Sequence, residues 1–145
     1  MLIPSLVVDA NVWVAAIDTT DRFHAESVAF LRTISRRGIA LRSPAILVLE
    51  VACAVARRFR DPALGDKVAD ELVQNRTMKL EPLTRALLTQ ALHLGTTCRL
   101  RAADALYAAT AATHAEDTLV TWDADLIDRA GAVTPSVWLA EQEPR

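Results

Sequence analysis

Residues 6–13 read LVVDANVW, and this stretch decides the fold class because a short apolar run stops at an acid and a helical pattern follows it. Residues 6–8 predict a fully buried strand, since a run of apolar residues without alternation has no solvent face. Residues 11–17 predict a short helix. Asp9 lies between the two, at the point where the strand ends.

The same order of strand and helix recurs along the chain. Further strands are expected at 39–41, 78–80, 119–121 and 133–139. Helices are expected at 23–37, 45–60, 84–94 and 102–115, with another from the Asp61-Pro62 break to about residue 75 and a short one ending at residue 130. Gly38 is expected to close the first of these helices and Pro44 to open the second. Short strands alternating with helices predict an α/β fold, a three-layer-like sandwich whose short, mainly parallel central sheet is flanked by helices.

Composition sets limits on the class of protein. The 145 residues are 52% hydrophobic and 23% charged, which is typical of a globular chain and predicts one domain over residues 1–145. The net charge of −2 excludes a strongly basic nucleic-acid binder but leaves room for an acidic site that acts on nucleic acid. The apolar N-terminus indicates a strand and no signal peptide. The longest apolar run, residues 45–56, is too short to span a bilayer, so no membrane association is expected.

The two cysteines, Cys53 and Cys98, are far apart and form no CxxC pair. This excludes zinc ribbons and thioredoxin-like redox sites. Free thiols suit a reducing compartment, so a cytoplasmic location is expected.

Acidic residues follow two of the predicted strands. In parallel sheets the ligand crevice lies beyond the carboxyl ends of the strands. Asp9 follows the first strand directly, and Asp123 follows the strand at 119–121 within two residues. Either could be a metal ligand. The alternative is helix capping, by Asp9 for the helix behind it and by Asp123 with Asp125 for the short helix ending at residue 130.

Glu50 is the most unusual acid because it lies inside the apolar segment 45–56. A buried carboxylate is costly unless a cation or a metal ion neutralises it. The alternative to a metal ligand is a buried ion pair, with Arg57 or Arg101 as the partner. Asp104 lies among alanines at the start of the helix 102–115, where the helix dipole alone would also favour an acid.

The four acids, Asp9, Glu50, Asp104 and Asp123, come from four different elements. Two charges ~5 Å apart repel by about 3 kcal/mol at an effective dielectric near 20, so four converging carboxylates need a neutralising cation. Ligation by oxygen alone favours Mg²⁺ or Mn²⁺ over zinc. The histidines have no ligand spacing, and no Walker A loop or GxSxG motif is present.

The four acidic segments, taken in order, resemble the PIN domain family. Residues 6–13 resemble its opening strand with Asp and Asn, residues 44–51 its second motif with an acid inside a helix, residues 101–109 its Asp-Ala-Leu-Tyr-Ala-Ala motif, and residues 119–126 its fourth motif. The resemblance spans nearly the whole chain at the usual spacings. Trp122 is one departure, since a small or polar residue is common there.

The resemblance is strongest to VapC-type toxins, which implies a metal-dependent ribonuclease held in check by a small antitoxin, and a homodimer. It implies that Asp9, Glu50, Asp104 and Asp123 form a catalytic, metal-binding quartet. Asn11 and Thr121 would support the quartet, and Asp125 would join as an outer metal ligand. RNA as the substrate is implied by the resemblance alone.

The residues leave two other functions open. A non-catalytic module could use the acidic pocket to bind a partner protein. An aspartyl-nucleophile phosphatase could use Asp9, although such enzymes open with Asp-x-Asp and Asn11 replaces the second acid. RNA phosphates would be bound by arginines near the site, and the candidates are Arg57, Arg58, Arg99 and Arg101. A solvated helix face explains these arginines equally well.

Overall fold

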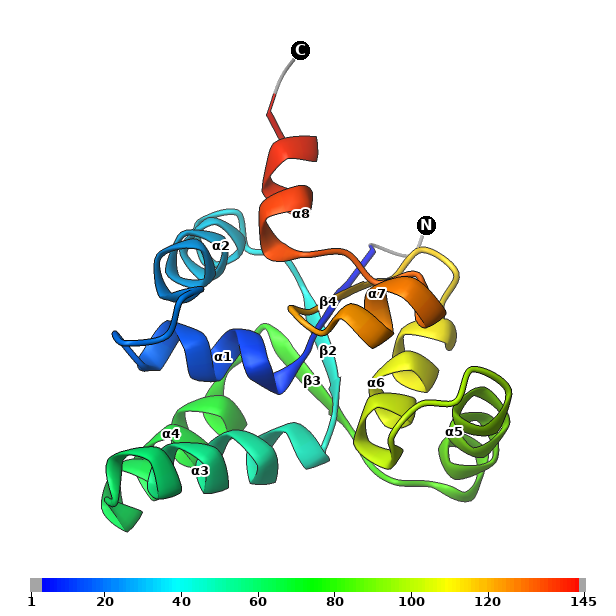
Figure 1. Cartoon of the computed structure of the whole chain (residues 1–145), viewed down its shortest axis with the longest axis horizontal. Helices are drawn as coiled ribbons and strands as arrows, with labels where there is room; N and C mark the ends of the chain where they lie inside the picture. The colour runs from blue at the N-terminus through cyan, green and yellow to red at the C-terminus, as the bar shows by residue number, and fades with distance from the viewer. Residues whose placement is uncertain (1–3, 144–145) are drawn as a thin grey trace.

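The computed structural model describes residues 4–143 and builds them around one parallel sheet. The strands are β1 (Leu6–Val8), β2 (Leu41–Pro44), β3 (Met78–Glu81) and β4 (Thr118–Val120), in the spatial order β3-β2-β1-β4. Leu6 lies opposite Leu41 on one side and opposite Thr118 on the other. Because β1 is thus a central strand, Asp9 leaves the sheet at the middle of its carboxyl edge (Figure 1).

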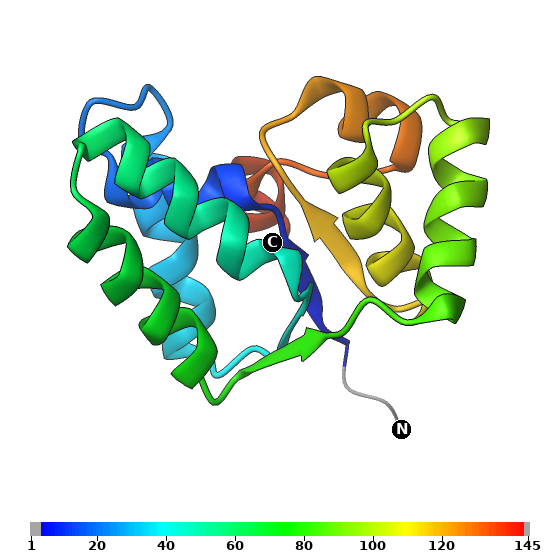
Figure 2. The same cartoon turned by 90° about the horizontal axis from the view of Figure 1, so that it is seen from below.

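Helices connect and cover these strands. They are α1 (Ala10–Ile17), α2 (His24–Arg36), α3 (Ile46–Phe59), α4 (Pro62–Gln74), α5 (Arg85–Thr97), α6 (Ala102–Ala112), α7 (Ala124–Ala130) and α8 (Pro135–Glu141). Figure 2 shows the α3–α4 pair and the α5–α6 pair on opposite sides of the molecule, with the sheet between them. The carboxyl edge of the sheet therefore opens between two helical pairs.

The side chains of the strands alternate between two cores, as the pleat requires. Val7 and Leu119 pack in one core with residues of α3, α4 and α6. Leu6, Val8 and Val120 pack in the other, with residues of α2 and α8. The predicted three-layer α/β arrangement is confirmed, and every strand pair within residues 4–143 is parallel.

Three predictions about elements are wrong. The last predicted strand, 133–139, is helix α8 apart from one bridge between Val133 and Val120, because Thr134 caps the helix and Pro135 occupies its first turn. The second strand covers 41–44 rather than 39–41. Pro44 is the last residue of that strand, and the helix starts at Ile46. A proline is tolerated there because the following N–H, of Ala45, continues the ladder to the carbonyl of Glu81.

Within residues 4–143 the chain forms no helix of the length and hydropathy that a bilayer crossing requires. Both cysteines are free thiols, with Cys53 exposed and Cys98 half-buried.

Helices α3 and α4 approach closely at Gly65. A methyl group added there would lie 2.8 Å from the carbonyl oxygen of Ala52 and 3.0 Å from Cβ of Ala56. Gly65→Ala gains about 1 kcal/mol of helix propensity, but overpacking of this kind costs about 1–3 kcal/mol. We expect a net loss of unfolding free energy in urea denaturation. A stabilised variant would contradict the close helix contact.

Candidate metal and active site

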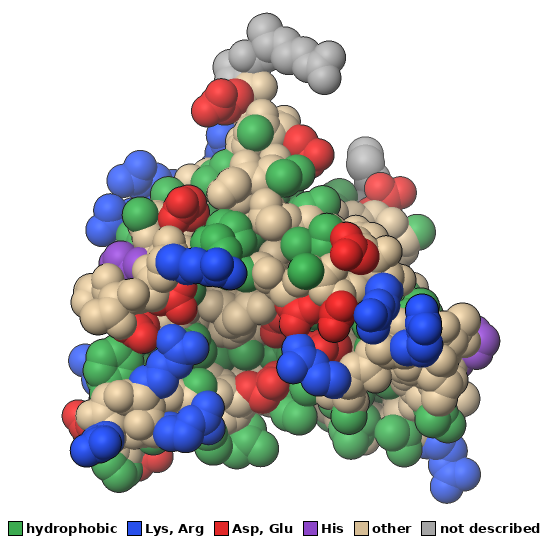
Figure 3. Space-filling model, viewed as in Figure 1, with side chains coloured by type: hydrophobic (Ala, Val, Ile, Leu, Met, Phe, Trp, Pro, Cys, Tyr) green, Lys and Arg blue, Asp and Glu red, His purple; other side chains and the backbone are tan. Residues whose placement is uncertain are grey.

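The four candidate acids lie at the carboxyl edge of the sheet. Asp9 directly follows β1, Glu50 lies in α3 behind β2, Asp104 lies in the first turn of α6, and Asp123 is the N-cap of α7. Figure 3 shows acidic side chains gathered at the centre of this face with basic side chains on both sides. The arrangement follows from the topology, because parallel strands bring their carboxyl ends to one edge.

Asp9 is buried, with 6% of its surface exposed, and its orientation is fixed by Thr121. The Thr121 hydroxyl donates to Asp9 Oδ2 at 2.7 Å and accepts hydrogen bonds from Asn11 Nδ2 at 3.1 Å and from the backbone N–H of Asp123 at 3.0 Å. One buried hydroxyl thus joins the ends of β1 and β4 at the site. The side chain of Asp9 makes no capping hydrogen bond to α1, so the capping alternative does not account for it.

Asn11 is held by two groups and is directed toward β4. Its Nδ2 donates to Thr121, and its Oδ1 accepts from the backbone N–H of Trp122 at 3.2 Å. Trp122 itself stacks on Phe23 with ring centroids 4.0 Å apart and donates from Nε1 to Ser27. The bulky residue at this position therefore packs toward α2, while its backbone orients Asn11.

Burial and mutual repulsion alter the titration of the acids. Burial, together with the charges of Asp104 and Glu50, raises the pKa of Asp9 to about 6 against the Thr121 hydrogen bond, which lowers it. Burial also raises the pKa of Glu50 and of Asp104, and Asp104 contributes to the shift at Glu50. Glu50 and Asp104 are thus close enough to destabilise the ionised form of Asp9, and Asp104 is close enough to destabilise that of Glu50.

Glu50 is half-buried, and its partner is Tyr107. The Tyr107 hydroxyl donates to Glu50 Oε1 at 2.8 Å, and the ring is fully buried. Burial and the charges of Glu50 and Asp9 raise the pKa of Tyr107, so the phenol remains a donor. The alternative of an ion pair with Arg57 or Arg101 is wrong, because no ion pair involving Glu50 occurs in the described part of the chain.

Tyr107 was not among the residues expected at the site, although it belongs to the motif at 101–109. Its position three residues after Asp104 places both side chains on one face of α6. That spacing was the available signal.

Asp104 and Asp123 share an arginine. Arg101 donates from Nε to Asp104 Oδ2 at 3.0 Å and from Nη2 to Asp123 Oδ2 at 2.7 Å. Asp123 also caps α7, because its Oδ1 accepts from the backbone N–H groups of Asp125 and Leu126. The capping alternative therefore holds for one oxygen of Asp123 and leaves the other directed toward the site.

Asp125 lies farther out. Its side chain is 55% exposed and pairs with Arg129 at 3.3 Å. Between residues 4 and 143, no three Asp, Glu, His or Cys side chains are placed closely enough to ligate one ion as they stand. The acids share one edge of the sheet, and an ion held there would bind fewer than three of these side chains in this arrangement.

A groove of about 450 Å³ runs from this edge along α1 and α3. Asn11 and Glu50 lie at its inner end, and Arg57 and Arg58 also line it. Arg58 pairs with Asp18 and Asp21, which reduces its free charge. Arg99 lies apart from the groove, in a left-handed turn with φ of 55°.

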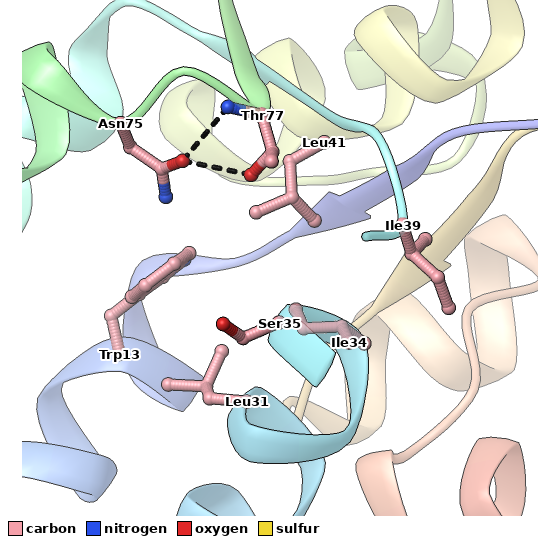
Figure 4. Close-up of a pocket in the computed structure, with 8 residues that line it drawn as sticks. All are labelled: Trp13, Leu31, Ile34, Ser35, Ile39, Leu41, Asn75 and Thr77. Carbon is pink, nitrogen blue, oxygen red and sulfur yellow. Dashed lines mark hydrogen bonds between the residues drawn. The ribbon is translucent and has the colours of Figure 1, made fainter. Parts of the chain in front are cut away.

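A second hollow of about 260 Å³ lies between α1, α2 and the starts of β2 and β3 (Figure 4). Its lining is mainly apolar, and its polar groups include Asn75, whose Oδ1 accepts from the N–H and hydroxyl of Thr77. The lining includes no acidic or basic side chain. Chemistry on a charged substrate therefore belongs to the acidic edge.

Asp9→Asn is expected to stabilise the fold at neutral pH. A pKa of about 6 in the fold against 3.8 in the unfolded chain means that the native state loses stability as the pH rises from 4 to 6. The pKa shift corresponds to a loss of at most roughly 3 kcal/mol of unfolding free energy. Asparagine can still accept from Thr121. Urea unfolding in a chelator at pH 7.5 should show a gain of about 1–3 kcal/mol, which largely disappears at pH 4. An unchanged or lower stability at pH 7.5 would contradict a strained, ionised Asp9.

The comparisons with known proteins agree with this geometry. The model of the PIN domain family matches residues 6–132. Curated protein sequences gave no match. One similar solved structure is FitAcB from Neisseria gonorrhoeae, with a TM-score of 0.67, 22% identity, and 90% of this chain and 98% of that chain covered. A second is VapC20 of Mycobacterium tuberculosis, a sarcin–ricin loop cleaving toxin, with a TM-score of 0.72, 16% identity, and 86% of this chain and 94% of that chain covered. A third is a toxin–antitoxin complex from Klebsiella pneumoniae, with a TM-score of 0.65, 18% identity, and 90% of this chain and 98% of that chain covered. At these identities the likeness establishes the fold.

Proposed function

Because this chain belongs to the PIN domain family, we propose that it is a divalent-metal-dependent endoribonuclease and the toxin of a toxin–antitoxin pair. The observation that carries the proposal is the convergence of Asp9, Glu50 and Asp104 at one sheet edge, where burial raises the pKa of each and neighbouring carboxylates add to each shift. A set of carboxylates that repel one another in a crevice is typical of a functional site, because a folded chain gains nothing from the repulsion itself.

The donor set fits Mg²⁺ or Mn²⁺. Its groups are carboxylates, which hard divalent cations prefer, and the guanidinium of Arg101 already lies against two of them. Asp9, Glu50, Asp104 and Asp123 would hold the ion, with Asp125 as an outer ligand. A bound ion would supply Lewis-acid activation of water and of the phosphodiester.

The chain's own residues prepare the site. Thr121 and Asn11 hold Asp9 toward the crevice, and Tyr107 holds Glu50. The capping bonds of α7 fix Asp123. Such support keeps carboxylates in place and accounts for about 10–100-fold in affinity or activity where it has been removed from metal sites.

The RNA backbone would follow the groove between α1 and α3. Arg57 is exposed there and makes no ion pair within residues 4–143, so its charge is available to a phosphate. Arg58, Arg99 and Arg101 are weaker candidates, because Arg58 and Arg101 are already paired and Arg99 lies apart.

Arg57→Gln should weaken RNA binding and reduce the dependence of the binding constant on salt concentration. An unchanged salt dependence would remove this residue from the RNA path.

The proposed partners are a small antitoxin and a second copy of the chain. The similar toxin–antitoxin complex from Klebsiella pneumoniae supports an antitoxin. The groove bordered by Leu49, which is 62% exposed, suits an apolar segment of that partner.

Exposed Leu83, Leu88 and Leu92 border another apolar hollow of about 480 Å³, which supports the homodimer. Light scattering at micromolar concentration measures the dimer, and a monomer contradicts it.

The direct test is cleavage of an unstructured RNA with Mn²⁺ and with a chelator. We expect the wild-type chain to cleave this RNA with Mn²⁺ and the chelator to stop the cleavage. We expect Asp9→Asn to lose both the cleavage and the thermal stabilisation by Mn²⁺. A metal response identical in Asp9→Asn would contradict the site. Partner binding without cleavage would favour a binding module. A phospho-aspartate trapped at Asp9 would favour the phosphatase, against which Asn11 already argues, since it is an amide bonded to Thr121 and Trp122.

A further inference from the structure

Arg101 places a positive charge within the acidic site. Its guanidinium bridges Asp104 Oδ2 at 3.0 Å and Asp123 Oδ2 at 2.7 Å, while 74% of its side chain remains exposed. Arg101 is also the N-cap residue of α6. The positive end of the helix dipole disfavours a cation there. The two carboxylates therefore determine where the guanidinium lies.

Arg101 occupies the one oxygen of Asp123 that the fold leaves free. Oδ1 of Asp123 accepts from the backbone N–H groups of Asp125 at 2.8 Å and Leu126 at 3.3 Å, which commits it to α7. Oδ2 is bonded to Arg101 alone among the described residues. A cation that binds Asp123 without unwinding the start of α7 must therefore bind at Oδ2, where the guanidinium of Arg101 already lies at 2.7 Å and repels it.

Resting on the metal-dependent function proposed above, we propose that Arg101 is an internal counter-cation that competes with the divalent ion for Asp104 and Asp123. It thereby sets the ion concentration at which the site fills. Arg101 neutralises the two acids at low ion concentration and swings out when the ion binds. Its high exposure lets the side chain leave without disturbing the core.

The competition should be measurable but modest. Exposed ion pairs are weak, but Arg101 forms two of them at once through its planar guanidinium, one from Nε and one from Nη2. Removing Arg101 ends the competition and also removes a positive charge beside the bound ion. We therefore expect Arg101→Gln to bind Mn²⁺ about tenfold more tightly, which corresponds to about 1.4 kcal/mol.

The test is calorimetric titration of Mn²⁺ into the wild-type chain, Arg101→Gln and Arg36→Gln. Arg36 is an exposed residue of α2 that makes no ion pair within residues 4–143, so its variant matches the charge change at a remote position. Tighter binding in Arg101→Gln, with Arg36→Gln close to wild type, supports the proposal. An equal gain in both variants overturns it, because net charge would then be the cause.

Arg101→Lys is the second variant, since lysine keeps the charge but has no planar guanidinium to bond Asp104 and Asp123 together. We expect its affinity to lie between those of wild type and Arg101→Gln. If the wild-type chain binds Mn²⁺ and Arg101→Gln binds it no more tightly, the competition is overturned and the proposed function is left intact. No binding by any of the proteins overturns the metal-dependent function, and this proposal with it.

Discussion

Expression of the Asp104→Ala chain in a bacterial host is expected to leave growth unimpaired, whereas expression of the native chain is expected to stop it. Asp104 is buried, its ionised form is disfavoured by burial, and small residues surround it on α6. Removing the carboxylate therefore costs little packing but removes a proposed metal ligand. RNA cleavage in vitro should fall by roughly 100-fold or more.

Asp128→Ala is the matched control, because Asp128 is exposed on α7 and takes part in no ion pair within the described residues. It makes the same change in charge and should arrest growth like the native chain. Co-expression of the partner encoded beside this chain should also relieve the arrest. Arrest that persists in folded, equally abundant Asp104→Ala would mean that toxicity is not metal-dependent cleavage, and a binding module would then explain it better.

Glu50→Gln is expected to abolish cleavage while the chain folds as before. The amide oxygen of the new side chain can still accept from the Tyr107 hydroxyl, and no arginine loses a partner, because Glu50 is bonded to Tyr107 and not to a cation. Burial raises the pKa of Glu50, so removing its charge should leave the unfolding free energy at pH 7.5 unchanged or slightly higher.

Cleavage rates and urea unfolding in a chelator measure the two effects separately. Glu71→Gln, an exposed change on α4, is the control and should retain full activity. A loss of about 3–5 kcal/mol in Glu50→Gln would indicate that the carboxylate balances a buried cation, as a structural ion pair would. Retained cleavage would remove Glu50 from the metal site.

Local signals predicted most of the architecture. The apolar run before Asp9 indicated β1, and Thr84 indicated the start of α5, where its hydroxyl accepts from Leu87 N–H. Residues 133–139 are apolar enough for a strand, but the Thr134-Pro135 start signal makes them a helix. Pro44 ends β2 and does not open α3, and local sequence could not decide between the two, because proline is tolerated in both positions.

Pairing between distant side chains could not be predicted in the same way. The positions of four acids could be identified from the sequence, because each stands beside an apolar segment. The pairing of Arg101 with Asp123 depends on how α6 and α7 approach one another, and the pairing of Tyr107 with Glu50 depends on α6 and α3. Such contacts are set by tertiary packing, which local periodicity does not encode.

The place of β1 between β2 and β4 has a consequence during synthesis. The neighbour on one side is made early, but β4 begins only at residue 118, and it brings Thr121 and Asp123 with it. Chains emerge from the ribosome N-terminus first at about 5–20 residues per second. A nascent chain that carries Asp9 and Glu50 therefore lacks the hydroxyl that orients Asp9 until residue 121 has been made. The acidic site is thus incomplete for the first 120 residues of synthesis, and it forms only after β4 pairs with β1.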